Sequence, residues 1–239
     1  GVGLATPGLR QLYPKAQIIV ADQAAGFVRQ GRKAASRWRR LPGVVSGLGR
    51  LPFATSSMDL IFSSLVLHRV SDLAMAVREF QRVLTPGGVL MFATFGPDSL
   101  KELRAAWASV DEAGHVQSFV DMHDIGDALV GARWADPGWD LDHFTLTYAD
   151  VEGVFTDLTA LGLRNVLAAR RKGLMTPRRL QAMQAAYDHN RDSTGRVPAT
   201  WEVAYGHAWG TEGQAQIKGE TGAVHVPITG DAIPRRSRE

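Results

Sequence analysis

The sequence contains no cysteine in its 239 residues. A disulfide, a thiolate metal site and a cysteine nucleophile are therefore all excluded. There is also no run of eighteen apolar residues, so we expect no membrane-spanning helix. The apolar fraction of 45% is ordinary for a globular protein. At this length we expect one large α/β domain that carries a small additional lobe.

Acidic residues are absent from two stretches in which basic residues gather. Residues 23–58 contain 7 arginines and lysines, and residues 164–179 contain 6. Each stretch is either a solvated helix face or a surface that recruits an acidic protein, a phosphorylated ligand or nucleic acid. We do not expect nucleic acid, because only Phe27 and Trp38 are interleaved with these cations to stack on bases.

The first twenty-two residues have the order of the second half of a nucleotide-binding βαβ unit. A glycine turn over 1–3 precedes a short helix over 6–13, and an apolar strand over 18–21 ends at Asp22. Glycines let the backbone approach a ligand, and an acid about twenty residues later receives the ribose hydroxyls. The strand that would lead into Gly1 is not part of this chain, so we expect a sheet that lacks its first strand.

Strands and helices alternate over the first hundred residues, which predicts a Rossmann-like, doubly wound parallel sheet. In this part we expect a helix over 23–38, a helix over 71–84 that Ser71-Asp72 caps, and strands over 44–45, 60–64 and 89–95. Further on we expect helices over 100–110, 121–130, 150–161 and 177–190, the first of them with Asp98 or Ser99 as its N-cap. We also expect strands over 140–148 and 200–209. The predicted division is a nucleotide-binding core (1–148), a helical insert (149–195), the last core strand (196–210) and a loosely ordered tail (211–239).

A helix, a Pro-Gly-Gly turn and a strand follow one another directly over residues 79–90, after a strand that ends near Ser64. Together with the glycine turn, this order resembles the class I S-adenosylmethionine-dependent methyltransferases. An NAD-type dehydrogenase is disfavoured because the Pro-Gly-Gly element is not part of its pattern. The resemblance implies S-adenosylmethionine as the cofactor. The residues that it places around this cofactor are Gly1, Gly3, Asp22, Gln23, Gly47, Leu48, Ser64 and Leu65.

Longer motifs occupy residues 95–104, 119–127, 146–148, 161–165 with Arg170, and 196–209. These motifs are more specific than the fold signature, and they resemble the malonyl-carrier-protein O-methyltransferases of biotin synthesis. The resemblance runs from Gly1 to about Trp209. It implies methyl transfer from S-adenosylmethionine to the free carboxyl group of a malonyl thioester on acyl carrier protein.

A carboxylate has a reference pKa of about 4, so this nucleophile is ionised at neutral pH and needs no general base. A cation should orient it, and arginine is suited because its fork binds both oxygens. Arg170 is the leading candidate for this role, with Asn165 as its helper. Tyr205 and His207, on the last strand, are the candidates for lining the acyl pocket. We expect no metal, because no His, Asp or Glu group has ligand spacing.

Acyl carrier protein is acidic, so the basic run over 164–179 is the predicted docking surface. We expect a cytoplasmic monomer that binds neither nucleic acid nor a membrane. One departure from the family is the lack of an acid in residues 46–50, where relatives place one on the adenine amino group. Backbone groups near Gly47 and Leu48 would then hold the adenine.

Two alternatives stay open at the level of sequence. A complex I assembly factor that hydroxylates an arginine shares the Pro-Ala-Thr ending over 198–200 and much of the insert. A non-catalytic assembly protein that keeps the fold is the other. The segment over 121–127 favours the methyltransferase.

Overall fold

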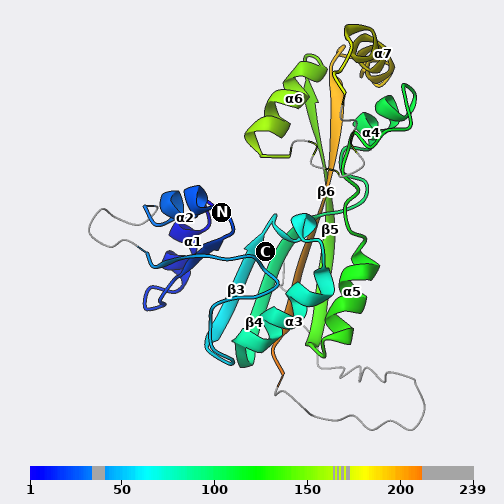
Figure 1. Ribbon diagram of the computed structural model, residues 1–239. Coiled ribbons are helices and arrows are strands. Elements are labelled where there is room, and N and C mark those ends of the chain that lie inside the picture. Colours follow the sequence, from blue (N-terminus) through cyan, green and yellow to red (C-terminus); the bar gives the residue numbers. More distant parts are fainter. Residues whose placement is uncertain (34–40, 164, 166, 168–169, 171–172, 212–239) are drawn as a thin grey trace, which may run out of the picture.

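The computed structural model describes residues 1–33, 41–163, 165, 167, 170 and 173–211. Its described strands form a two-stranded parallel sheet, β1-β2, and a four-stranded sheet in the order β3-β4-β6-β5 (Figure 1). β3 and β4 are parallel, whereas β6 is antiparallel to both β4 and β5. The strands are β1 Val20–Asp22, β2 Gly43–Val45, β3 Met58–Ser64, β4 Leu84–Phe95, β5 Ala135–Tyr148 and β6 Val197–Trp209.

The division into two sheets agrees with the expected doubly wound order. In that order the first strand lies between the second and the fourth strands of the fold. Here β1 and β2 take the second and third places, and β3 and β4 take the fourth and fifth. The sheets separate between β1 and β3, where the doubly wound order has its first strand. The predicted Rossmann-like α/β class is confirmed.

Two helices cover one face of the four-stranded sheet (Figure 1). α3 forms because apolar residues recur three and four positions apart and Asp72 caps it, its carboxylate accepting a 2.7 Å bond from the Met75 amide. Its apolar side chains and those of α5 pack on β4 and β6 in the first hydrophobic cluster. The helices are α1 Thr6–Leu12, α2 Ala25–Gly31, α3 Leu73–Val83, α4 Lys101–Ala108, α5 Met122–Gly131, α6 Val151–Ala160 and α7 Pro177–Asp188, with a 3-10 turn η1 at Leu67–Arg69.

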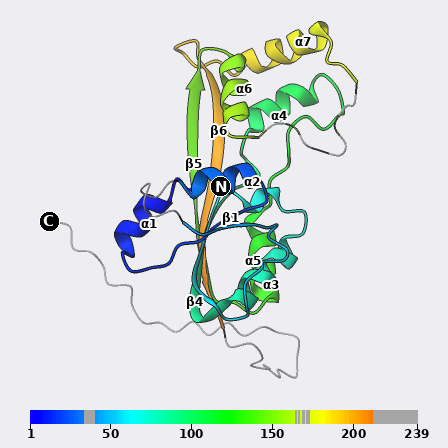
Figure 2. The same cartoon turned by 60° about the vertical axis from the view of Figure 1, so that its left-hand side comes forward.

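The ribbon of β5 and β6 runs beyond the ends of β3 and β4, and α4, α6 and α7 gather around this extension (Figure 2). Val197, Ala199 and Trp201 of β6 are buried there against these helices in the second hydrophobic cluster. We call α4, α6 and α7 with this part of the ribbon the upper lobe. α6 and α7 belong to the predicted insert, whereas α4 comes from the predicted core.

Some local predictions were wrong. α4 was expected to have Asp98 or Ser99 as its N-cap, but Leu100 occupies that position at φ 59° with no side-chain cap. The Ser99 hydroxyl is engaged elsewhere, donating to the Glu202 carbonyl at 2.9 Å and accepting from the Glu202 amide at 3.0 Å. β4 begins at Leu84, not at residue 89, so the Pro-Gly-Gly segment is part of the strand.

Other predictions reach outside the described residues. Only part of the expected helix over 23–38 is seen, as α2, because residues 34–40 lie outside the described residues. The predicted tail also lies outside them from residue 212 on. None of the described helices is both long and apolar enough to cross a membrane. The described residues also contain no cluster of three or more His, Asp or Glu side chains placed to bind a metal ion.

Candidate functional site

Asp22 ends β1 directly beside the glycine turn. Its Oδ1 accepts a 2.7 Å hydrogen bond from the Ala24 amide, and its Oδ2 lies 2.5 Å from the ammonium group of Gly1. Gly3 has φ +79°, a conformation that favours glycine. The structure therefore brings the turn and the acid together, as the sequence predicts. Gln23, which follows, is exposed.

The loop over residues 46–53, which we call the cofactor loop after the role predicted for Gly47 and Leu48, starts beside Asp22. The Ser46 amide donates to the Asp22 carbonyl at 3.1 Å, and the Ser46 hydroxyl donates to the Arg50 carbonyl at 2.7 Å. Gly47 is exposed, and Leu48 packs against the first hydrophobic cluster. The predicted adenine segment is therefore next to the predicted ribose acid.

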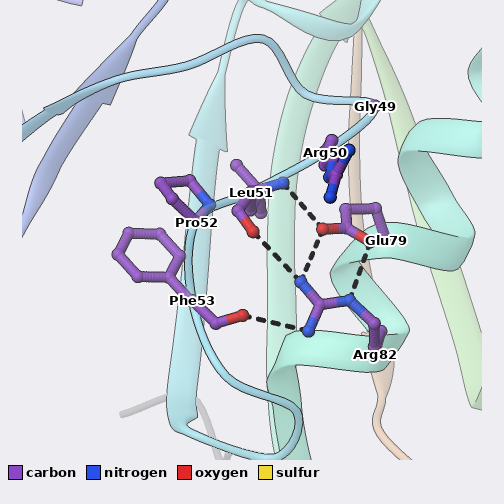
Figure 3. A pocket seen from close by; sticks show the side chains of 7 residues that line it. All are labelled: Gly49, Arg50, Leu51, Pro52, Phe53, Glu79 and Arg82. Carbon is purple, nitrogen blue, oxygen red and sulfur yellow. Dashed lines mark hydrogen bonds and ion pairs between the residues drawn. The ribbon is translucent and has the colours of Figure 1, made fainter.

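Glu79 and Arg82 of α3 hold the other end of this loop (Figure 3). The Glu79 carboxylate accepts from the Leu51 amide at 2.7 Å and from Arg82 Nη2 and Nε at 2.6 and 2.9 Å. Arg82 also donates to the carbonyl groups of Leu51 and Phe53, at 3.1 and 3.0 Å. The hydrogen bond from Arg82 is the main reason that the pKa of Glu79 is lowered, and the same bond raises the pKa of Arg82.

The carboxyl ends of the parallel strands β3 and β4 lie at one edge of the four-stranded sheet. Ser64 is exposed at the end of β3, and Leu65 follows it with φ +52° while its amide donates to the Ala93 carbonyl at 2.8 Å. A non-glycine residue with positive φ is strained, and such strain often marks functional positions. Ser64 and Leu65 thus lie where a ligand of a parallel sheet binds.

His68, just after β3, is buried among aromatic rings. Its ring centroid lies 5.0 Å from that of Phe95 and 5.7 Å from that of Phe119, and only 4% of the residue is exposed. Neither ring nitrogen has a hydrogen-bond partner among the described residues. Burial, assisted by the charge of Arg69, lowers the pKa of His68 to about 4, so the ring is neutral at physiological pH.

Two motifs that are a hundred residues apart in sequence bind each other at the base of the upper lobe. Glu102 accepts from the Thr200 amide at 3.0 Å and from the Thr200 hydroxyl. The Glu202 carboxylate accepts a hydrogen bond from the Asp98 amide at 2.7 Å. It also packs against the backbone of Gly96, where an added Cβ would lie 2.6 Å from the carboxylate. The motifs over 95–104 and 196–209 therefore join the lobe to the sheet.

The predicted carboxylate-binding residues Asn165 and Arg170 meet at one turn of the upper lobe. The Asn165 amide donates to the Gly114 carbonyl at 2.7 Å, and its oxygen accepts from the Leu167 amide at 3.0 Å. Arg170 Nη1 donates to the Leu167 carbonyl at 3.1 Å and the residue is exposed. Asn165 thus shapes the turn from which Arg170 projects.

Tyr205 and His207 occupy another place. They lie on β6 opposite Ala93 and Met91 of β4, with their side chains on the exposed side of the strand. No hydrogen bond or ion pair among the described residues joins them to Asn165 or Arg170. The structure does not bring these two pairs together.

The basic run over 164–179 has two different cations on α7. Arg178 is exposed, whereas Arg179 is half-buried and its Nη1 lies 3.6 Å from Asp111 Oδ2. The same Asp111 binds His115 at 2.7 Å, and the His115 ring stacks on Trp107 with centroids 3.9 Å apart. Arg179 is therefore partly structural.

The family follows from comparison with known proteins. A family model described as "Methyltransferase domain" matches residues 1–92. Malonyl-acyl-carrier-protein O-methyltransferase of Halorhodospira halophila is 45% identical over 239 residues, which is 100% of this chain and 80% of the relative. The chain belongs to the malonyl-acyl-carrier-protein O-methyltransferase family. The protein of the same name from Laribacter hongkongensis is 46% identical over 217 residues, 87% of this chain and 73% of the relative.

The fold of this O-methyltransferase family member also occurs among solved structures. YcgJ protein from Bacillus subtilis has a TM-score of 0.63 at 15% identity, with 89% of each chain covered. The predicted family is confirmed, and the arginine hydroxylase and non-catalytic alternatives are not favoured by relatives that are named for methyl transfer.

Sequence reasoning did not assign roles to Glu79, Arg82 or Glu202, and it proposed Ser99 only as an N-cap. The first two stand three residues apart on one face of a helix, a spacing that indicates an ion pair. Their binding to the cofactor loop, and the binding of Ser99 to Glu202, join segments that are distant in sequence. No local pattern reports such contacts.

Proposed function

We propose that the protein transfers a methyl group from S-adenosylmethionine to the free carboxylate of a malonyl thioester carried by acyl carrier protein. The observation that carries this proposal is the 45% identity to a malonyl-acyl-carrier-protein O-methyltransferase, which extends over 80% of that relative's length. The juxtaposition of the glycine turn, Asp22 and the cofactor loop supports the cofactor.

The chemistry demands little proton transfer. A malonyl carboxylate oxygen attacks the methyl carbon of the sulfonium, an O–CH3 bond forms, and the S–CH3 bond breaks with its electron pair left on sulfur. The products are the malonyl methyl ester and S-adenosylhomocysteine. Because the nucleophile is already ionised, the protein contributes mainly orientation and exclusion of water.

For the cofactor, we assign the ribose hydroxyls to the Asp22 carboxylate and the adenine to backbone groups at Gly47 and Leu48. Gln23, Ser64 and Leu65 complete the proposed edge, with Gly1 and Gly3 as the close-approach turn.

For the substrate, we assign the carboxylate to Arg170, positioned by Asn165 through the turn at Leu167. Tyr205 and His207 stay predictions for the acyl pocket. The docking surface proposed for the acidic carrier protein is the basic run over 164–179, in which the exposed Arg178 is the best-placed described cation. Cytoplasmic location, a monomeric state, and the lack of nucleic-acid and membrane binding also stay predictions.

The test is methyl transfer from S-adenosylmethionine carrying a labelled methyl group to malonyl-acyl carrier protein. We expect a base-labile ester on the carrier and release of S-adenosylhomocysteine, and no ester with acetyl-acyl carrier protein, which lacks the free carboxylate. Binding of the cofactor without ester formation would instead favour the non-catalytic alternative. Hydroxylation of an arginine peptide would favour the other alternative.

A further inference from the structure

The cofactor loop lacks the acidic side chain that would contact the adenine directly. Residues 46–50 contain no Asp or Glu. In the proposed site, backbone groups at Gly47 and Leu48 replace that contact. A backbone group cannot change rotamer to reach a ligand, so its position depends on what anchors the loop on either side. The anchors therefore become part of the cofactor site.

One anchor is the Ser46 amide on the Asp22 carbonyl, at 3.1 Å. The other anchor is the pair Glu79 and Arg82, which engages the amide and the carbonyl of Leu51 and also the carbonyl of Phe53 (Figure 3). Glu79 is well shielded, with 12% of its side chain exposed, and Arg82 contacts it through two nitrogens. Such bidentate, charge-assisted bonds are the stronger and more directional ones.

A third contact presses the same loop onto the same helix. Gly49 lies so close to α3 that an added Cβ would stand 2.5 Å from Met75 Cε. The loop therefore follows α3 on the side of Gly49 and is hydrogen-bonded to it at Leu51. Gly47 and Leu48 lie between this contact and the Ser46 anchor.

We propose that Glu79 and Arg82 are positioning residues that set the adenine end of the S-adenosylmethionine site by holding the cofactor loop on α3. They touch neither cofactor nor substrate. This inference rests on the proposed function, because it assumes that Gly47 and Leu48 meet the adenine. It accounts for an ion pair that engages three backbone groups of one loop.

The experiment compares Arg82→Met and Glu79→Gln with the unaltered protein by calorimetric titration of S-adenosylmethionine. Glu79→Gln keeps the volume and shape of the side chain, so it remains informative if Arg82→Met folds poorly. We expect the Kd to rise by about tenfold in each, since each change removes charge-assisted bonds to the loop. The Kd of the double variant should be no higher than about that of the weaker-binding single variant, because both residues act through one network.

The matched control is Arg191→Met. Arg191 also pairs with a carboxylate three residues earlier, Asp188, at 2.7 Å, and also donates to two backbone carbonyls, those of Ala149 and Gly195. Its side chain is 35% exposed, against 36% for Arg82, but it lies in the upper lobe. We expect its Kd for S-adenosylmethionine to match that of the unaltered protein.

Amide hydrogen exchange supplies a readout that does not depend on ligand. Exchange at Leu51 should accelerate in Arg82→Met and Glu79→Gln and stay unchanged in Arg191→Met. The KM for malonyl-acyl carrier protein, measured at saturating cofactor, should stay within about twofold, because a positioning role acts on the cofactor alone.

The possible outcomes distinguish a failure of the positioning role from a failure of the proposed function. An unchanged Kd in both Arg82→Met and Glu79→Gln overturns the positioning role while the proposed function stands. An equal rise in the Kd of Arg191→Met also overturns the positioning role, since general destabilisation would then explain the weaker binding. If the unaltered protein does not bind S-adenosylmethionine, the proposed cofactor site itself fails, which is seen before any variant is compared.

Discussion

Reversing the charge of Arg178 is the cleanest test of carrier-protein docking. Arg178 is exposed and forms no ion pair with any described residue, so Arg178→Glu removes one cation and disturbs little else. Arg179→Glu would be ambiguous. Its new carboxylate would face Asp111 at about the present 3.6 Å, a repulsion of about 1 to 5 kcal/mol for effective dielectric constants between 80 and 20.

The size of the effect follows from the charge alone. One acidic residue of the carrier about 10 Å away interacts with Arg178 by about 0.4 kcal/mol in water, so reversal costs about 0.8 kcal/mol. The KM for malonyl-acyl carrier protein should therefore rise about fourfold at low salt. The increase should shrink at high salt, because the Debye length then falls below that separation.

The assay measures kcat and KM with malonyl-acyl carrier protein and with malonyl-pantetheine, which lacks the carrier's acidic surface. The KM for malonyl-pantetheine should not change. Arg29→Glu is the control, because Arg29 is an exposed cation of the other basic stretch. An equal increase for both substrates, or the same increase in Arg29→Glu, would refute docking on the run over 164–179.

The remaining predictions concern the site and its support. Asp22→Asn should raise the Kd for S-adenosylmethionine about tenfold by calorimetry, since the ribose loses a charged acceptor; an unaltered Kd would reject Asp22 as the ribose ligand. Glu102→Ala should lower the free energy of unfolding by about 1 to 3 kcal/mol in urea, because Thr200 loses both of its bonds to Glu102; unchanged stability would contradict that anchoring. The pKa of His68 falls from 6.5 to about 4 on folding. The unfolded chain therefore binds the proton first, and about 3 kcal/mol of stability should be lost between these pH values. The His68→Gln variant should not show this loss of stability. Identical pH profiles of urea unfolding for the variant and the unaltered protein would contradict the prediction.

Local signals predicted the elements well where one segment supplies its own cap and its own apolar stripe. α3 begins after Asp72 as expected, because its cap and its 3.6-residue period both lie within twelve residues. Asp150 caps α6 in the same way, accepting from the Gly153 amide at 3.0 Å. The glycine turn and Asp22 were likewise predicted to meet, because a short helix and one strand are all that separates them.

Predictions failed where a distant partner competes for the same group. Ser99 is a good N-cap by residue type, yet its hydroxyl binds the backbone of Glu202, and α4 starts without a side-chain cap. The Pro-Gly-Gly segment was expected to be a turn before a strand that starts at residue 89. The Gly87 amide instead donates to the Gly210 carbonyl at 2.8 Å, and β4 begins at Leu84.

The sequence by itself determined the Rossmann-like class and the family, because strand and helix periods, glycine turns and motif spacing are local properties. Tertiary structure alone decided which cations are exposed, since Arg178 and Arg179 are neighbours in sequence but only Arg179 faces Asp111. It also separated Tyr205 and His207 from Arg170, and it showed that Glu79 and Arg82 hold the cofactor loop. These outcomes depend on packing between segments that lie 28 or more residues apart along the chain.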